Sequence, residues 1–117
     1  MRAVLALVFS VLAPWAHAFP VERCVNLSNF LEVGRTESWA YEYRTAHLGT
    51  IAEAGVDTLR VPINAADWWV DGRLDPRFRA LVIHTVKAAR AEGLTVIVDL
   101  HHYDRFIADP VTYGDQF

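Results

Sequence analysis

This 117-residue chain has one cysteine, no excess of basic residues and no long apolar segment beyond its N-terminus. A single thiol, Cys24, excludes an internal disulfide, and we expect it to be a small buried residue of a first strand. Eleven basic and fourteen acidic residues give a net charge of −3, so we expect no nucleic-acid partner. Because nothing after residue 18 has the length of a membrane span, we expect no membrane partner either.

Residues 1–18 have the pattern of a secretory signal peptide. Arg2 supplies a positive charge, residues 3–13 are apolar, and residues 16–18 form a small-x-small cleavage signal. We predict cleavage after Ala18 and a secreted or periplasmic protein. The alternative is a buried N-terminal helix.

Strand and helix patterns alternate through residues 19–117. The predicted order is strand 23–28, helix 43–54, strand 57–62, helix 75–92 and strand 95–101. Asp75 caps the longer helix, Pro76 takes its first position and Gly93 ends it. This order predicts an α/β fold with a parallel sheet. The strand spacing is typical of a (β/α)8 TIM barrel of about 250 residues, so we expect its first three βα units, truncated.

The alternation of side chains along the strands favours a barrel over an open sheet. The apolar face comprises Leu59, Val61, Val96, Val98 and Leu100, and the opposite face Thr58, Arg60, Ile97, Asp99 and His101. A barrel has helices outside and functional groups inside at the carboxyl ends of its strands. A doubly wound sheet is more often apolar on both faces.

Three segments, in order, resemble motifs of one enzyme family. CVNLSNFLE (24–32) resembles the GINLGNALE opening of cellulase-type glycoside hydrolases of family 5, GVDTLRVPI (55–63) resembles GFDTVRIPV, and GLTVIVDLHHYD (93–104) resembles GLYVILDLHHYD. The chain departs from the pattern at Cys24 and Ser28, where glycines are usual. It departs again at residues 63–69, where the family often has a nearer tryptophan.

The resemblance implies a retaining glycosidase that acts on a β-linked polysaccharide or oligosaccharide, with no cofactor and no metal. Such enzymes use two carboxylates about 5–5.5 Å apart, one as acid/base and one as nucleophile. In the family both are glutamates that follow the fourth and seventh strands. The glutamates here occupy neither position; they are Glu22, Glu32, Glu37, Glu42, Glu53 and Glu92.

We therefore predict that this chain holds no catalytic residue. Because only three strand patterns precede Phe117, the acid/base and the nucleophile are expected beyond that residue, in a longer, monomeric parent. The fragment itself is expected to be inactive.

Two residues at strand ends match supporting machinery of the family. Arg60 matches an arginine that hydrogen-bonds the nucleophilic carboxylate and fixes its rotamer. His101 matches a histidine that binds a sugar hydroxyl next to the cleaved bond. The structural alternatives are an ion pair across the barrel and a core histidine, and the matched motifs favour the functional roles. Asp99, one layer below His101, is expected to orient its neighbours.

Weaker candidates for substrate contact are His102, Tyr103, Asn26, Trp68 and Trp69. Asn26 ends the first strand on its inward side. Trp68, Trp69 and Trp39 lie in strand-to-helix loops on the active-site face, where an aromatic ring can stack on a sugar. The alternatives are strand-end hydrogen bonding for Asn26 and loop packing for the tryptophans.

Two other function classes stay open. His101, His102 and Asp104 resemble the ligands of a metal-dependent hydrolase, although adjacent strand residues point to opposite sides and one metal cannot easily take both histidines. The loop tryptophans are compatible with a non-catalytic sugar-binding module. Such modules are usually all-β, whereas this pattern is α/β.

Overall fold

The computed structural model describes residues 21–34 and 43–114. Outside these ranges lie the predicted signal peptide, Trp39 and Phe117. Both catalytic glutamates are expected beyond Phe117. The prediction that the acid/base and nucleophile follow Phe117 therefore stays a prediction.

The described elements alternate between strands and helices. They are β1 (Cys24–Asn26), α1 (Ala46–Glu53), β2 (Thr58–Ile63), the 3-10 helix η1 (Ala66–Trp68), β3 (Trp69–Val70), β4 (Arg73–Leu74), α2 (Pro76–Ala91), β5 (Thr95–Leu100), α3 (Asp104–Ala108) and α4 (Pro110–Tyr113). Across the two described ranges, no helix has both the length and the apolar character that a membrane crossing requires.

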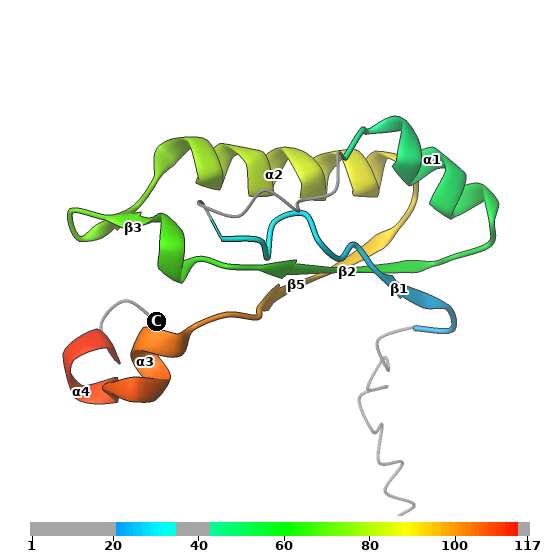
Figure 1. The fold of residues 1–117 in the computed structure, drawn as a ribbon. Coiled ribbons are helices and arrows are strands. Elements are labelled where there is room, and N and C mark those ends of the chain that lie inside the picture. The colour runs from blue at the N-terminus through cyan, green and yellow to red at the C-terminus, as the bar shows by residue number, and fades with distance from the viewer. Residues whose placement is uncertain (1–20, 35–42, 115–117) are drawn as a thin grey trace, which may run out of the picture.

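Three parallel strands form the main sheet in the order β1-β2-β5, and α1 and α2 lie along one side of it (Figure 1). The register places Asn26 beside Arg60 and Pro62 beside Asp99. Helical connections between parallel strands bring their carboxyl ends to one edge. The predicted α/β fold with a parallel sheet is therefore confirmed.

The core lies between the sheet and these two helices. Leu59 and Val61 of β2 are fully buried and belong to one cluster with Leu48 of α1 and with Phe78 and Ala89 of α2. Burial of a valine- or leucine-sized side chain stabilises a fold by about 1.5–3 kcal/mol. The central strand is thus the best anchored part of the sheet.

The start and end of α2 follow the predicted signals. The Asp75 carboxylate accepts a hydrogen bond from the backbone N–H of Arg77 at 2.8 Å, and Pro76 occupies the first turn. That backbone hydrogen bond lowers the pKa of Asp75 below its ordinary value. Gly93, at φ +81°, follows the helix in a left-handed conformation that suits glycine.

Three sequence expectations are corrected by the packing. Helix α1 begins at Ala46, and Tyr43 lies before it with its ring centroid 4.5 Å from that of Phe30. Cys24 is exposed, since β1 pairs on one side only among the described strands. The helical spacing of apolar residues in 75–92 predicts Leu81 in the buried stripe of α2. Leu81 is instead exposed, and the buried side includes Thr85, whose hydroxyl donates to the carbonyl of residue 81.

Sequence analysis missed the β3–β4 hairpin and the two short helices after β5. The hairpin turns at Asp71 and Gly72, which have φ angles of +51° and +74°. An Asp-Gly pair is a strong signal for this kind of turn. Helix α4 begins at Asp109 and Pro110, the same pair of residue types that begins α2, and Asp109 accepts from the N–H of Thr112. Both signals were present in the sequence.

Candidate functional site

Four side chains from all three parallel strands meet near the carboxyl edge of the sheet; we call Asn26, Arg60, Asp99 and His101 the strand-end cluster. Arg60 Nη1 donates to Asn26 Oδ1 at 3.0 Å, and Arg60 Nη2 donates to Asp99 Oδ2. His101 Nδ1 lies 3.0 Å from Asp99 Oδ2 and 3.2 Å from Arg60 Nη2. The cluster is therefore one connected network centred on Arg60.

Strand register and side-chain alternation build this cluster. Asn26 and Arg60 are register neighbours, so their side chains leave the sheet on the same side. Asp99 lies two residues after Ile97, the register partner of Arg60, and therefore shares that face. This is the face opposite to Leu59 and the helices, as the alternation predicted.

The cluster is partly open to solvent. The side chains of Arg60 and Asp99 are 31% and 30% exposed, and that of His101 is 42% exposed. An arginine carries five N–H donors, and the contacts to Asn26 and Asp99 do not use all of them. The guanidinium is held by β1 and β5 and can still orient a carboxylate or a sugar oxygen.

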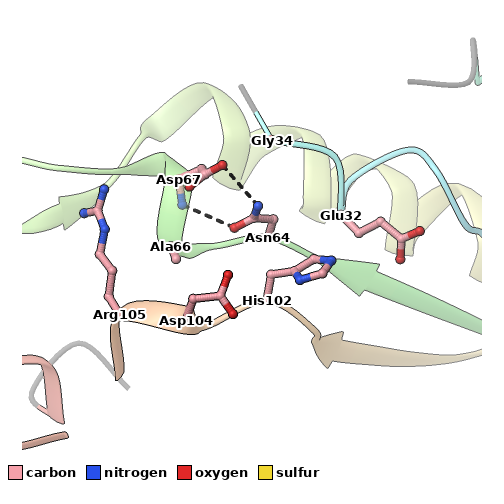
Figure 2. Close-up of a pocket in the computed structure, with 8 residues that line it drawn as sticks. All are labelled: Glu32, Gly34, Asn64, Ala66, Asp67, His102, Asp104 and Arg105. Carbon is pink, nitrogen blue, oxygen red and sulfur yellow. Dashed lines mark hydrogen bonds between the residues drawn. The ribbon is translucent and has the colours of Figure 1, made fainter. Parts of the chain in front are cut away.

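Beside the strand-end cluster lies a cavity of about 490 Å³. Its lining comprises Glu32, Gly34, Asn64, Ala66, Asp67, His102, Asp104 and Arg105 (Figure 2). Asn64 Nδ2 donates to Asp67 Oδ2 at 3.2 Å, and the N–H of Asp67 donates to Asn64 Oδ1 at 3.3 Å. These two bonds fix the loop after β2. A concave site with several polar side chains suits a polyhydroxylated ligand.

The other predicted contact residues divide into two groups. His102 follows the end of β5 and lines the cavity, as Figure 2 shows. Tyr103 is buried against Phe106, and burial raises the pKa of its phenol. Trp68 stacks on Phe78 with ring centroids 4.8 Å apart, and Trp69 begins β3. The structure therefore joins Asn26, Arg60 and His101, places His102 nearby, and packs Tyr103 and Trp68 against interior rings.

Sequence reasoning missed Glu32, Asn64 and Asp67 as lining residues. Glu32 ends the first family-like motif, and its Oε1 accepts from the N–H of Asn29 at 2.7 Å. Asn64 and Asp67 follow β2 directly, the position from which a barrel strand presents its loop. Their position just after a strand could have identified them from the sequence as candidate site residues.

Within residues 21–34 and 43–114, no group of three or more His, Cys, Asp or Glu side chains is arranged to hold a metal ion. The rings of His101 and His102 meet edge to face, with centroids 4.8 Å apart and an interplanar angle of 76°. His101 Nδ1 is turned toward Asp99 and Arg60.

The described residues form an α/β parallel sheet with a polar cluster near the carboxyl edge, where barrel enzymes carry their active sites. Comparison with known proteins identifies the family. The family model for cellulase (glycosyl hydrolase family 5) matches residues 19–116, and the chain belongs to this family. No curated protein matches the sequence.

Solved structures of endoglucanases and a cellulose synthase subunit are similar to the chain. Subunit Z of the clostridial cellulose synthase from Clostridioides difficile is 26% identical, with a TM-score of 0.77 over 83% of this chain and 33% of its own. Cel5A of Thermotoga maritima, solved with mannotriose, is 25% identical, with a TM-score of 0.75 over 82% of this chain and 32% of its own. A hyperthermophilic endo-β-1,4-glucanase solved with substrate is 28% identical, with a TM-score of 0.74 over 80% of this chain and 31% of its own. The chain spans about a third of the length of these structures.

Proposed function

We propose that this chain is the first three βα units of a TIM-barrel glycosidase that hydrolyses β-linked polysaccharide with retention of configuration. The strand-end cluster carries this proposal, because it gathers Arg60, Asn26 and His101 at the edge where barrel enzymes bind substrate. Family membership supports hydrolysis of glycosidic bonds. The structures solved with mannotriose and with a glucanase substrate support a β-glycan ligand.

Each residue then has a defined part in the reaction. Arg60 holds the nucleophilic carboxylate with the donors that Asn26 and Asp99 leave free. His101 binds a sugar hydroxyl next to the scissile bond, and His102 binds sugar in the cavity. Asn26 also faces the substrate.

The aromatic residues of the strand-end loops contribute less to substrate binding than the polar residues of the cluster. Trp69 begins β3 in the loop region after β2, where an aromatic ring can stack on a sugar. Tyr103 and Trp68 pack against Phe106 and Phe78, so they shape the loops that carry the contact residues.

Both reacting carboxylates come from further βα units of the barrel, which follow Phe117. Three of the described glutamates support this: Glu22 precedes β1, Glu53 ends α1 before β2, and Glu92 follows α2 before β5. All three belong to the amino ends of the strands, away from the cluster. Glu32, Asp67 and Asp104 line the cavity, but the family uses two glutamates that follow the fourth and seventh strands of the barrel, and none of these three residues holds such a position.

The test uses the protein extended through the rest of its barrel, which we call the extended protein. Incubation with cellulose, mannan and xylan oligosaccharides, followed by NMR of the first anomer released, should show hydrolysis with the β configuration retained. Residues 19–117 alone should give no product, because they lack the carboxylate pair. An inverted product, or no product from any β-glycan with a folded extended protein, would overturn the proposal.

We also propose that residues 1–18 direct export and are removed. The apolar run and the small residues before Phe19 support this. N-terminal sequencing of the exported protein should begin at Phe19. A mature protein that retains residues 3–13 would contradict it.

A further inference from the structure

The roles proposed for Arg60 and His101 leave one charged member of the strand-end cluster without a function of its own. Asp99 Oδ2 accepts a hydrogen bond from Arg60 Nη2 and lies 3.0 Å from His101 Nδ1. A single oxygen atom on β5 is therefore in contact with a side chain of the central strand and with the residue just beyond its own strand. No other described acidic side chain contacts either partner.

The chemistry of the three groups decides where the imidazole proton lies. An ionised carboxylate only accepts hydrogen bonds and a guanidinium only donates them, whereas each imidazole nitrogen does either. If His101 Nδ1 were bare, it could accept from Arg60 Nη2 at 3.2 Å, but its lone pair would also face the nearer Asp99 oxygen at 3.0 Å, an acceptor against an acceptor. If Nδ1 carries the proton, Asp99 accepts from both His101 and Arg60, and the two positive ends converge on one negative charge. The shorter contact, 3.0 Å to Asp99 against 3.2 Å to Arg60, and the bond that Arg60 Nη2 already donates to Asp99 favour the second arrangement.

We propose that Asp99 is a positioning residue that fixes the Arg60 guanidinium and holds His101 in its Nδ1-protonated tautomer. In a neutral imidazole, a proton on Nδ1 leaves Nε2 as a lone-pair acceptor, because the hydrogen bond at one ring nitrogen sets the state of the other. His101 then accepts a hydrogen bond from a sugar hydroxyl. This deepens the proposed function, on which the substrate part of the inference rests.

The tautomer can be measured without any assay of activity. In ¹⁵N-labelled extended protein at about pH 8, where an ordinary histidine is neutral, long-range ¹H–¹⁵N spectra distinguish the protonated ring nitrogen from the bare one. His101→Gln identifies the His101 signals by their disappearance. We expect a protonated Nδ1 and a bare Nε2 in the unaltered protein. A protonated Nε2 would overturn the inference, even if no variant of Asp99 folds.

Variants separate positioning from general charge effects. Asp99→Ala should lose the Nδ1–H state of His101 and lower kcat/KM by about 10²-fold, because both Arg60 and His101 lose their fixed geometry. Asp99→Asn keeps an acceptor oxygen at the same place and should recover part of both losses. The matched control is Asp71→Asn, which removes the same charge from an exposed turn residue that accepts the left-handed conformation. It should leave the His101 spectrum and kcat/KM unchanged.

The outcomes for the inference and for the proposed function are distinct. An Asp99→Ala protein that retains the Nδ1–H state of His101 would overturn the inference, whatever its activity. An inactive unaltered protein with the expected tautomer and its loss in Asp99→Ala would overturn the proposed function and leave the positioning role supported. A change in thermal stability alone, with spectrum and kinetics unaltered, would reduce Asp99 to a structural ion pair and contradict the inference.

Discussion

The central strand β2 and the outer strand β5 carry the same alternation of side chains but differ in what covers them. On the side facing the helices, Leu59 and Val61 of β2 are fully buried, whereas Val98 and Leu100 of β5 are 45% and 42% exposed. Strand β2 lies between β1 and β5 in the sheet, and β5 pairs on one side only among the described strands. Burial of a strand is therefore decided by its neighbours, not by its own pattern.

On the opposite side of the sheet, β2 and β5 both supply side chains to the strand-end cluster. Arg60 comes from β2, and Asp99 and His101 come from β5 and its end. The well-covered strand and the open strand both contribute charged groups to the strand-end cluster. The geometry of the candidate site thus depends on β5 as well as on the better covered β2.

The largest expected effect tests whether both strands contribute equally to the reaction. In the extended protein, Arg60→Ala and His101→Ala should each lower kcat/KM by about 10²-fold or more, because mispositioned catalytic groups commonly cost that much. This equals about 2.7 kcal/mol of transition-state stabilisation. Circular dichroism should show unchanged helix content, since both side chains lie on the face away from the helices. If only one of the two variants showed the kinetics of the unaltered protein, the strand that carries its residue would not contribute to the reaction.

The next effect compares the same substitution on both strands. Val61→Ala should lower the free energy of unfolding of the extended protein by about 2–3 kcal/mol, from lost burial and a residual cavity. Val98→Ala should cost nearly as much there, because further βα units of the barrel would cover β5. Urea denaturation measures both losses. A loss below about 1 kcal/mol for Val98→Ala would mean that β5 stays open, which contradicts the proposal of a truncated barrel.

The open face of β5 should also promote association of residues 19–117 when they are produced alone. An uncovered strand edge beside exposed Val98 and Leu100 offers a surface for other chains. Val98→Lys should shift the average mass seen by light scattering toward the monomer. The control Val111→Lys adds the same charge at an exposed valine outside the sheet and should have no such effect. A monodisperse unaltered monomer would contradict this prediction.

The smallest expected effect concerns the helix that covers β2. The hydrogen bond from Arg77 lowers the pKa of Asp75 in the folded state, so its stabilising contribution is complete above the ordinary pKa of about 3.9 and is lost as the pH falls through the lower folded value. Asp75→Ala should therefore lower Tm slightly at pH 7 and less at about pH 2.

Asparagine provides the control for this titration. Asp75→Asn keeps a capping oxygen for the N–H of Arg77 and should retain most of the stability at pH 7 without its pH dependence. Thermal unfolding followed by circular dichroism measures all three proteins. An Asp75→Ala protein with the same Tm deficit at both pH values would show that the loss does not depend on the carboxylate charge.

Local signals in the sequence predicted the three parallel strands, the two helices between them and the two faces of β2 and β5. Asp75 and Pro76 marked the start of α2 and Gly93 its end, because capping and backbone conformation are properties of a few adjacent residues. The period-2 pattern placed Arg60 and Asp99 on one face, and their hydrogen bond confirms it. The Asp71-Gly72 turn could have been predicted in the same way.

Contacts between distant segments decided the rest. Strand patterns alone placed Asn26, Arg60 and His101 on one face and toward the carboxyl ends of their strands, so these residues were predictable as neighbours. The sequence by itself did not determine that Tyr103 would pack inside, that Leu81 would stay exposed, or that Asn64 and His102 would share a cavity. Side-chain periodicity fixes a direction relative to the strand or helix, whereas burial and cavities depend on which other elements fill the space in that direction.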